Sequence, residues 1–172
     1  MGEGEVGVLV LHPVGRVIQG RPCPEQASKE AIGRGQEASD EPGWAEIEIG
    51  ADWAEALDGI EGFSHIWVVW WLDRFEAPPT SRRVHPEGRA EMPLVGLFAT
   101  RSPRRPCPVA ITVVRLLAHE GARLRVEGLD ACEGTPVLDI KPYLRRGDLV
   151  PEATAPDWLE QMWQIHDEEC KA

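Results

Sequence analysis

The sequence predicts a mainly β protein that forms a small antiparallel barrel with long loops, one short helix and a C-terminal helix. Two observations lead to this fold class. Six or seven short runs rich in β-branched and aromatic residues follow one another between turns that contain glycine or proline. Strands and helices do not alternate along the chain, which excludes the parallel sheets of βαβ proteins. A compact antiparallel barrel is the simplest closure for that many short strands.

The expected strands are the β-prone runs between these turns. They cover residues 6–18, 44–49, 64–72, 94–100, 109–120, 122–129 and 136–140. The first is bent or split in two at Pro13. The run SHIWVVWWL at 64–72 is continuously apolar, which is typical of a strand that is buried on both faces. Polar segments at 19–43 and 74–93 are expected to form two long loops.

Two segments have helical signatures. ADWAEALDG at 51–59 predicts a short helix in which Asp52 and Glu55 form a capping box and Gly59 ends the helix. The C-terminal segment has apolar residues at helical spacing, which predicts a helix over 155–169. The expected domains are a barrel at 1–147 and a helical extension packed on it at 148–172.

The length of 172 residues fits one domain of ordinary size, or such a domain with a small appendage. Hydrophobic residues make up 42%, and no run reaches the length of about 18 apolar residues that a membrane span needs. The acidic N-terminus lacks the basic region of a signal peptide, so none is expected. The four cysteines are far apart and lack metal-ligand spacing. We therefore expect reduced thiols, no metal site and a cytoplasmic protein.

Charge is distributed unevenly along the chain. The net charge is −11, from 29 acidic and 18 basic residues, which by itself argues against a strong nucleic-acid binder. The basic residues nevertheless gather in three groups: Arg82/Arg83/His85, Arg101/Arg104/Arg105 and Lys141/Arg145/Arg146. These groups form either a local basic patch or solvated loops, and charge alone does not decide between the two.

The stretch GLFATRSPRRPCPVAITVV at 96–114 contains a turn with three arginines and three prolines among residues 101–108. Proline fixes φ and reduces the entropy that a loop loses when it becomes ordered. Arginine has a planar fork of donors that suits carboxylates and phosphates. Arg101 is therefore a candidate clamp for a carboxylate. The alternative is a proline-stiffened hairpin whose arginines are simply solvated.

A second dense stretch, GLDACEGTPVLDIKPYL at 128–144, contains Asp139, Lys141 and Tyr143 at intervals of two. In an extended chain such residues share one face. An acid, a base and a phenol on one face can orient a substrate or remove a proton. They are equally consistent with a cross-strand ion pair at the rim of a barrel.

Taken in order, three motifs resemble the signatures of the TsaA-like family of TrmO-type tRNA methyltransferases. They are GIEGFSHIWVVWWLDRF at 59–75, the arginine stretch at 96–114 and the acidic stretch at 128–144. The opening HPVGRVIQGRPCPEQ at 12–26 is similar to the first strand and loop of that family. The resemblance covers roughly residues 6–147.

The resemblance implies a small β-barrel that binds S-adenosyl-L-methionine (SAM) at or near a homodimer interface. It implies N6-methylation of threonylcarbamoyladenosine next to the anticodon of tRNA. It also implies cofactor contacts at Pro24, Glu25, Gln26, Asp73, Arg74, Arg101, Ile111, Glu127, Gly128, Leu129 and Asp130. Asp139, Lys141 and Tyr143 are the candidates for orienting the acceptor or removing its proton.

The chain departs from the family pattern at three places. Cys107 and Ala110 stand where the family commonly has asparagine and glycine in the turn, and the first loop has an acid, Glu25, where a basic residue is common. Only about 25 residues follow the barrel, and they are acidic. These departures and the net charge count against tRNA as the substrate. A small-molecule or other nucleoside acceptor, or a non-catalytic SAM-binding barrel, therefore remains an alternative.

Overall fold

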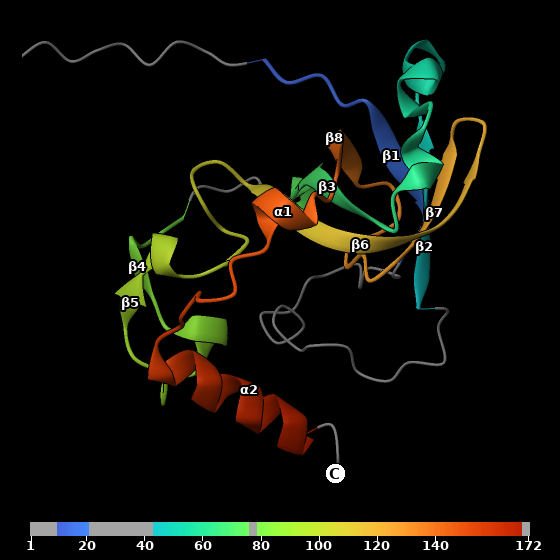
Figure 1. Cartoon of the computed structure of the whole chain (residues 1–172). Helices are drawn as coiled ribbons and strands as arrows, with labels where there is room; N and C mark the ends of the chain where they lie inside the picture. The colour runs from blue at the N-terminus through green and yellow to red at the C-terminus, as the bar shows by residue number, and fades with distance from the viewer. Residues whose placement is uncertain (1–9, 21–42, 76–78, 170–172) are drawn as a thin grey trace, which may run out of the picture.

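The computed structural model describes residues 10–20, 43–75 and 79–169. In this part of the chain, six strands close into an antiparallel barrel in the order β1–β2–β7–β6–β3–β8 (Figure 1). They are β1 (Gly15–Gln19), β2 (Trp44–Ile49), β3 (His65–Trp71), β6 (Val109–Glu120), β7 (Arg123–Glu127) and β8 (Pro136–Pro142). The prediction of a mainly β chain that forms a small antiparallel barrel is confirmed.

Every second residue of a barrel strand points into the core. In β3, Ile66, Val68 and Trp70 are buried, whereas the residues between them are partly exposed. The prediction that this strand is buried on both faces is wrong, because the wall of a barrel has one face in the core and the other face outside. The core also includes Ile47 of β2 and Leu124 of β7, both fully buried.

Strands β1 and β2 approach each other closely at Gly15. A Cβ atom at this position would collide with the carbonyl oxygen of Glu48 on β2. Glycine is therefore required here by the space between the two strands. The barrel depends on this residue for the pairing of Gly15 with Ile49 on β2 and with Val137 on β8.

Two local expectations are wrong. The segment Ala51–Leu57 is a 3₁₀ helix that follows Gly50 without a side-chain cap, so Asp52 does not form the expected capping box. Gly59 has a φ of 86°, a left-handed conformation that ends this segment as expected. The segment 94–100 is not one strand, because the two-residue strand β5 (Val95–Gly96) passes directly into a 3₁₀ turn at Leu97–Ala99.

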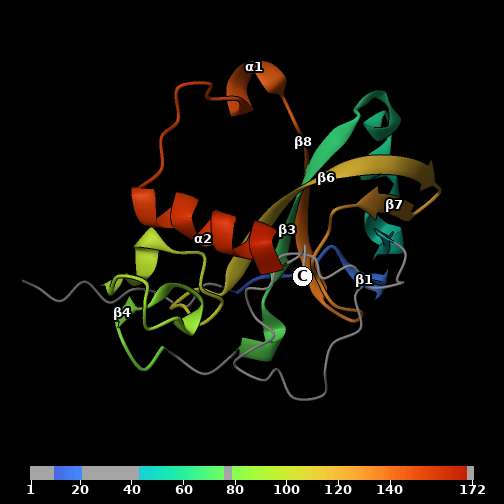
Figure 2. The ribbon, with the colours of Figure 1, turned by 90° about the horizontal axis from the view of Figure 1, so that it is seen from below.

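A smaller unit lies beside the barrel (Figures 1 and 2). It contains β4 (Arg83–Val84), which pairs with β5, and the C-terminal helix α2 (Asp157–Glu169), close to its expected range. The His166 Nε2 and Glu87 Oε2 atoms, 2.8 Å apart, join α2 to the segment between β4 and β5. A short helix, α1 (Arg145–Asp148), follows β8. None of the helices in the described residues is long and apolar enough to cross a membrane.

Candidate active site

Three of the segments expected to bind the cofactor meet at one end of the barrel. Because neighbouring strands are antiparallel, β1, β3 and β7 end where β2, β6 and β8 begin. Asp73 and Arg74 follow β3, the arginine-rich turn leads into β6, and Gly128–Asp130 follows β7. We call this the arginine end of the barrel. Pro24, Glu25 and Gln26 lie between β1 and β2 in the sequence, outside the described residues.

Arg105 fixes the shape of the arginine-rich turn. Its Nη1 donates to the backbone oxygens of Thr100 at 3.1 Å and Ser102 at 3.4 Å. The backbone N–H of Ser102 donates to the Thr100 hydroxyl at 3.3 Å. Arg101, between these two residues, is exposed, and no hydrogen bond or ion pair with another described residue involves its guanidinium. The turn is therefore held by one arginine and leaves another available to an anion.

Hydrogen bonds join the segments at this end of the barrel. The backbone N–H of Leu72 donates to the carbonyl of Pro108 at 2.8 Å, which joins the end of β3 to the arginine-rich turn. Arg74 Nη2 donates to the carbonyl of Glu133 at 3.4 Å, which joins the residues after β3 to the turn before β8. Asp73 and Arg74 thus lie beside both segments, although they are distant from them in sequence.

A chain of side chains connects the barrel core to Asp130. The indole Nε1 of Trp70 donates to the Thr112 hydroxyl at 3.1 Å, and that hydroxyl donates to Asp130 Oδ1 at 3.2 Å. Gly128, with a φ of 91°, turns the backbone after β7, and Leu129 packs against the core. Asp130 is exposed at the arginine end, although its carboxylate is connected to a buried tryptophan.

The remaining candidates lie on the outer face of the barrel wall. Across β8, β3 and β6, outward side chains form the rows Tyr143–His65–Arg115, Lys141–Trp67–Val113 and Asp139–Val69–Ile111. Asp139 and Lys141 share one face, as their spacing predicts. The register also brings Ile111, 51% exposed, into the same row as Asp139.

The acid and base of this outer face are already paired with each other. Lys141 Nζ lies 2.5 Å from Asp139 Oδ2. The Tyr143 ring packs 6.0 Å from the Trp67 ring and 6.4 Å from the His65 ring. The indole Nε1 of Trp67 in turn donates to Asp148 Oδ2 at 3.1 Å. The ion pair runs along β8 and does not cross between strands.

The cysteines differ from the expectation of four reduced thiols. Cys107, in the arginine-rich turn, is free and exposed, whereas Cys132 is disulfide-bonded. The expectation is therefore wrong for Cys132. Cys23 and Cys170 lie outside the described residues. A wide separation in the sequence does not exclude a disulfide, because folding can bring distant segments of a chain together.

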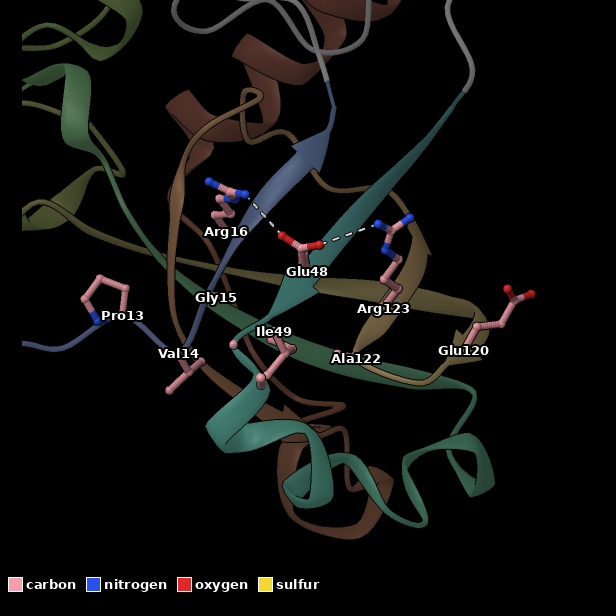
Figure 3. Close-up of a pocket in the computed structure, with 11 residues that line it drawn as sticks. Pro13, Val14, Gly15, Arg16, Glu48, Ile49, Glu120, Ala122 and Arg123 are labelled. Carbon is pink, nitrogen blue, oxygen red and sulfur yellow. Dashed lines mark hydrogen bonds and ion pairs between the residues drawn. The ribbon is translucent and has the colours of Figure 1, made fainter.

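A groove of about 560 Å³ lies at the opposite end of the barrel from these residues (Figure 3). It is lined by residues 13–16, 48–51, 120, 122 and 123, where β1 and β7 begin and β2 and β6 end. Glu48 occupies its rim, within 3.2 Å of Arg16 and 3.5 Å of Arg123. The two arginines therefore already have an acidic partner, and the groove contains none of the predicted site residues.

Three residues near the candidate site were not predicted from the sequence. Trp70 and Thr112 support Asp130 from inside the barrel, and Trp67 packs against Tyr143 on the outside. The alternation of strand positions would have placed Trp70 on the opposite face from Trp67. The contact of Thr112 with Asp130 has no such signal, because it depends on how β6 and the segment after β7 meet.

Known proteins resemble this chain in sequence. A protein of Archaeoglobus fulgidus named "Probable S-adenosyl-L-methionine-binding protein" is 43% identical over 67% of this chain and 30% of its own length. A protein of the same name from Methanothermobacter thermautotrophicus is 42% identical over 77% of this chain and 88% of its own length. The human tRNA (adenine(37)-N6)-methyltransferase is 38% identical over 54% of this chain and 21% of its own length.

Solved structures resemble the chain as well. The crystal structure of TrmO from Pseudomonas aeruginosa has a TM-score of 0.63 and 30% identity, over 86% of this chain and 62% of that one. This chain thus spans less than two thirds of TrmO and less than a third of the Archaeoglobus protein. The family model of the tRNA-methyltransferase O N-terminal domain matches residues 25–149. This range includes the arginine-rich turn, the acidic stretch and five of the six barrel strands, all except β1. With the motifs, the barrel and the relatives in agreement, the chain belongs to the tRNA-methyltransferase O family.

Proposed function

We propose that this chain is a SAM-dependent methyltransferase that methylates N6 of threonylcarbamoyladenosine next to the anticodon of tRNA. We place SAM at the arginine end of the barrel. The observation that carries this proposal is the meeting of Arg74, the arginine-rich turn and Asp130 at that end, with the Arg101 guanidinium exposed. The names of the archaeal and human relatives support the cofactor and the reaction.

The residues of the site bind and orient the reactants. SAM supplies a methyl group activated by its sulfonium, so the protein must align the acceptor nitrogen and exclude water. Arg101 binds the methionine carboxylate through its fork of donors. The Asp139–Lys141 pair and Tyr143 offer acceptors and donors side by side on the outer wall, where they orient the acceptor base.

The segment 79–105 supports tRNA as the substrate despite the net charge of −11. It contains six arginines and two glutamates, so the molecule is basic beside its site. Four of these arginines are exposed, namely Arg82, Arg83, Arg101 and Arg104. Arginines on one face of a protein bind phosphates even when the rest of the molecule is acidic. We therefore propose that Arg82 and Arg104 contact the tRNA backbone.

We also propose that a second copy of the chain covers the outer face of β6. Ile111, Val113 and Leu117 of this strand are 51%, 37% and 41% exposed, although all three are large and apolar. Exposed apolar surface of this kind is typical of an interface. Sedimentation analysis should give a dimer for the unchanged chain and a monomer for Val113→Asp. A monomer in both cases would contradict this part of the proposal.

A different acceptor is the second candidate. The observation in its favour is Cys107, which is exposed in the turn where the family commonly has asparagine. Replacing an amide by a thiol removes a strong donor and a strong acceptor from the substrate side of the turn. Under this candidate, the chain still binds SAM. It transfers no methyl group to tRNA, whether or not the tRNA carries threonylcarbamoyladenosine.

The test uses SAM with a labelled methyl group. Calorimetry measures SAM binding to the unchanged chain, to Arg101→Ala and to the matched control Arg104→Ala. We expect binding that is lost in Arg101→Ala and kept in Arg104→Ala. Labelled methyl transfer to tRNA carrying threonylcarbamoyladenosine supports the full proposal. SAM binding without transfer to this tRNA supports the second candidate, and the absence of SAM binding overturns both.

A further inference from the structure

Asp130 is the last member of a series of two hydrogen bonds that begins at Trp70 in the barrel core. Trp70 is 7% exposed, and its position is fixed by the packing of β3. Thr112 lies on β6, two residues after Ala110, which pairs with Trp70 on β3. Its hydroxyl is 3.1 Å from Trp70 Nε1 and 3.2 Å from Asp130 Oδ1. The three residues come from β3, β6 and the segment after β7, which are joined only by folding.

The chemistry of these groups fixes the donor and the acceptor in each of the two hydrogen bonds. An indole N–H is only a donor, and an ionised carboxylate is only an acceptor. The Thr112 hydroxyl has a single hydrogen. Since it accepts from Trp70, its own hydrogen is free to point to Asp130. A hydroxyl between two acceptors or two donors would not be ordered in this way. Trp70 therefore sets the rotation of the Thr112 hydroxyl and, through it, the orientation of the Asp130 carboxylate.

The second carboxylate oxygen of Asp130 remains available. Within the described residues, Oδ2 has no hydrogen-bond partner, and the residue is exposed at the arginine end. A carboxylate on a mobile side chain would lose rotational freedom when it binds a ligand. A carboxylate that is already oriented loses less, and so binds more tightly.

We propose that Trp70 and Thr112 are positioning residues that orient Asp130 to accept a hydrogen bond from a hydroxyl or amino group of SAM. This inference rests on the proposed function, because it needs SAM at the arginine end. It adds two residues inside the barrel to a site whose other members lie in loops or on the outer wall. Both act through Asp130 and do not touch the ligand.

The test is a double-mutant cycle on SAM affinity. Thr112→Val removes the hydroxyl at nearly constant volume, and Thr112→Ser keeps the hydroxyl as the matched control. Asp130→Ala and the double variant Thr112→Val/Asp130→Ala complete the cycle. Thermal unfolding of each variant measures its stability separately from its affinity. If Thr112→Val does not fold, Thr112→Ala takes its place in the same cycle.

We expect Thr112→Val to weaken SAM binding about tenfold, the effect of losing roughly one hydrogen bond to a charged group. Thr112→Ser should bind like the unchanged chain. In the Asp130→Ala background, Thr112→Val should have no further effect.

Equal weakening by Thr112→Val with and without Asp130 would overturn the inference, because the effect would then be structural. Unchanged affinity in Thr112→Val, or affinity in Thr112→Ser as weak as in Thr112→Val, would overturn it as well. Each of these results leaves the proposed function intact. A chain that binds no SAM before any substitution instead removes the proposed function, and this inference with it.

Discussion

Arg105 and Arg104 are neighbours with the same charge and different bonding, and they offer a sharp test of the turn. Arg105 donates two hydrogen bonds to backbone oxygens within the turn, whereas Arg104 is exposed and bonds to no other described residue. Arg105→Ala and Arg104→Ala each remove one positive charge. A difference between the two variants therefore reports the bracing of the turn and not the charge.

The size of the effect follows from the two hydrogen bonds. A bond from a charged donor contributes about 1.5–3 kcal/mol when it is shielded from water. Arg105 is partly exposed, and its bond to Ser102 is long at 3.4 Å, so we take about 2 kcal/mol for both together. If this free energy orders the turn for ligand binding, Arg105→Ala weakens SAM binding about 30-fold, since about 1.4 kcal/mol corresponds to a factor of ten.

Calorimetric titration of SAM into the two variants measures this difference. Arg104→Ala should bind SAM within about twofold of the unchanged chain, since about 0.4 kcal/mol separates such affinities. Arg105→Ala should also lower the free energy of unfolding by up to about 2 kcal/mol, because the same two hydrogen bonds stabilise the folded turn. Arg104→Ala should leave the melting temperature close to that of the unchanged chain, since Arg104 bonds to no other described residue. Equal affinities for Arg105→Ala and Arg104→Ala would refute the reasoning that the brace prepares the turn for the cofactor.

Three further predictions concern tRNA binding and stability. Arg82→Ala should reduce the slope of log affinity for tRNA against log salt concentration by about 1, measured by fluorescence anisotropy; an unchanged slope excludes a phosphate contact there. Gly15→Ala should destabilise the fold by about 3 kcal/mol in urea unfolding, because its Cβ would collide with Glu48, whereas Gly43→Ala, which has open space, should change stability by less than about 0.5 kcal/mol. Leu124→Ala should cost about 3 kcal/mol in the same assay, because Leu124 is fully buried and its loss leaves a cavity; a cost below about 1 kcal/mol would show that the core collapses around it.

The sequence was sufficient to predict the barrel, since its strands are short, β-prone and separated by strong turn residues. The alternation of side chains also placed Asp139 and Lys141 on one face. The sequence was less informative where a few residues decide the structure. The run at 94–100 has strand composition, but it pairs over only two residues before the Thr100 hydroxyl donates to the Leu97 carbonyl and closes a turn. Local β propensity does not show whether strand pairing or this turn prevails.

The site was predictable only in part, and for a physical reason. The residues of each motif are visible in the sequence, but the contacts between motifs depend on strand pairing. Nothing in the run around Thr112 indicates that its hydroxyl lies between an indole from β3 and a carboxylate after β7. The resemblance to a family implies cofactor contacts at Asp130 and Arg101, and these stay predictions. It did not indicate that Arg105 holds the turn or that Trp70 supports the carboxylate from within.

The short turn between β6 and β7 has a practical consequence. Gly121, with a φ of 59°, forms this turn at the end of the barrel opposite the arginine end. A Cβ atom at this position would meet no other atom within 4 Å. Exposed loop tips accept inserted sequence most readily. A purification handle or a reporter peptide inserted at Gly121 would lie at the end of the barrel opposite Arg101, Asp130 and the rest of the arginine end. The protein can thus be immobilised on a surface by its hairpin tip with the arginine end facing the solution.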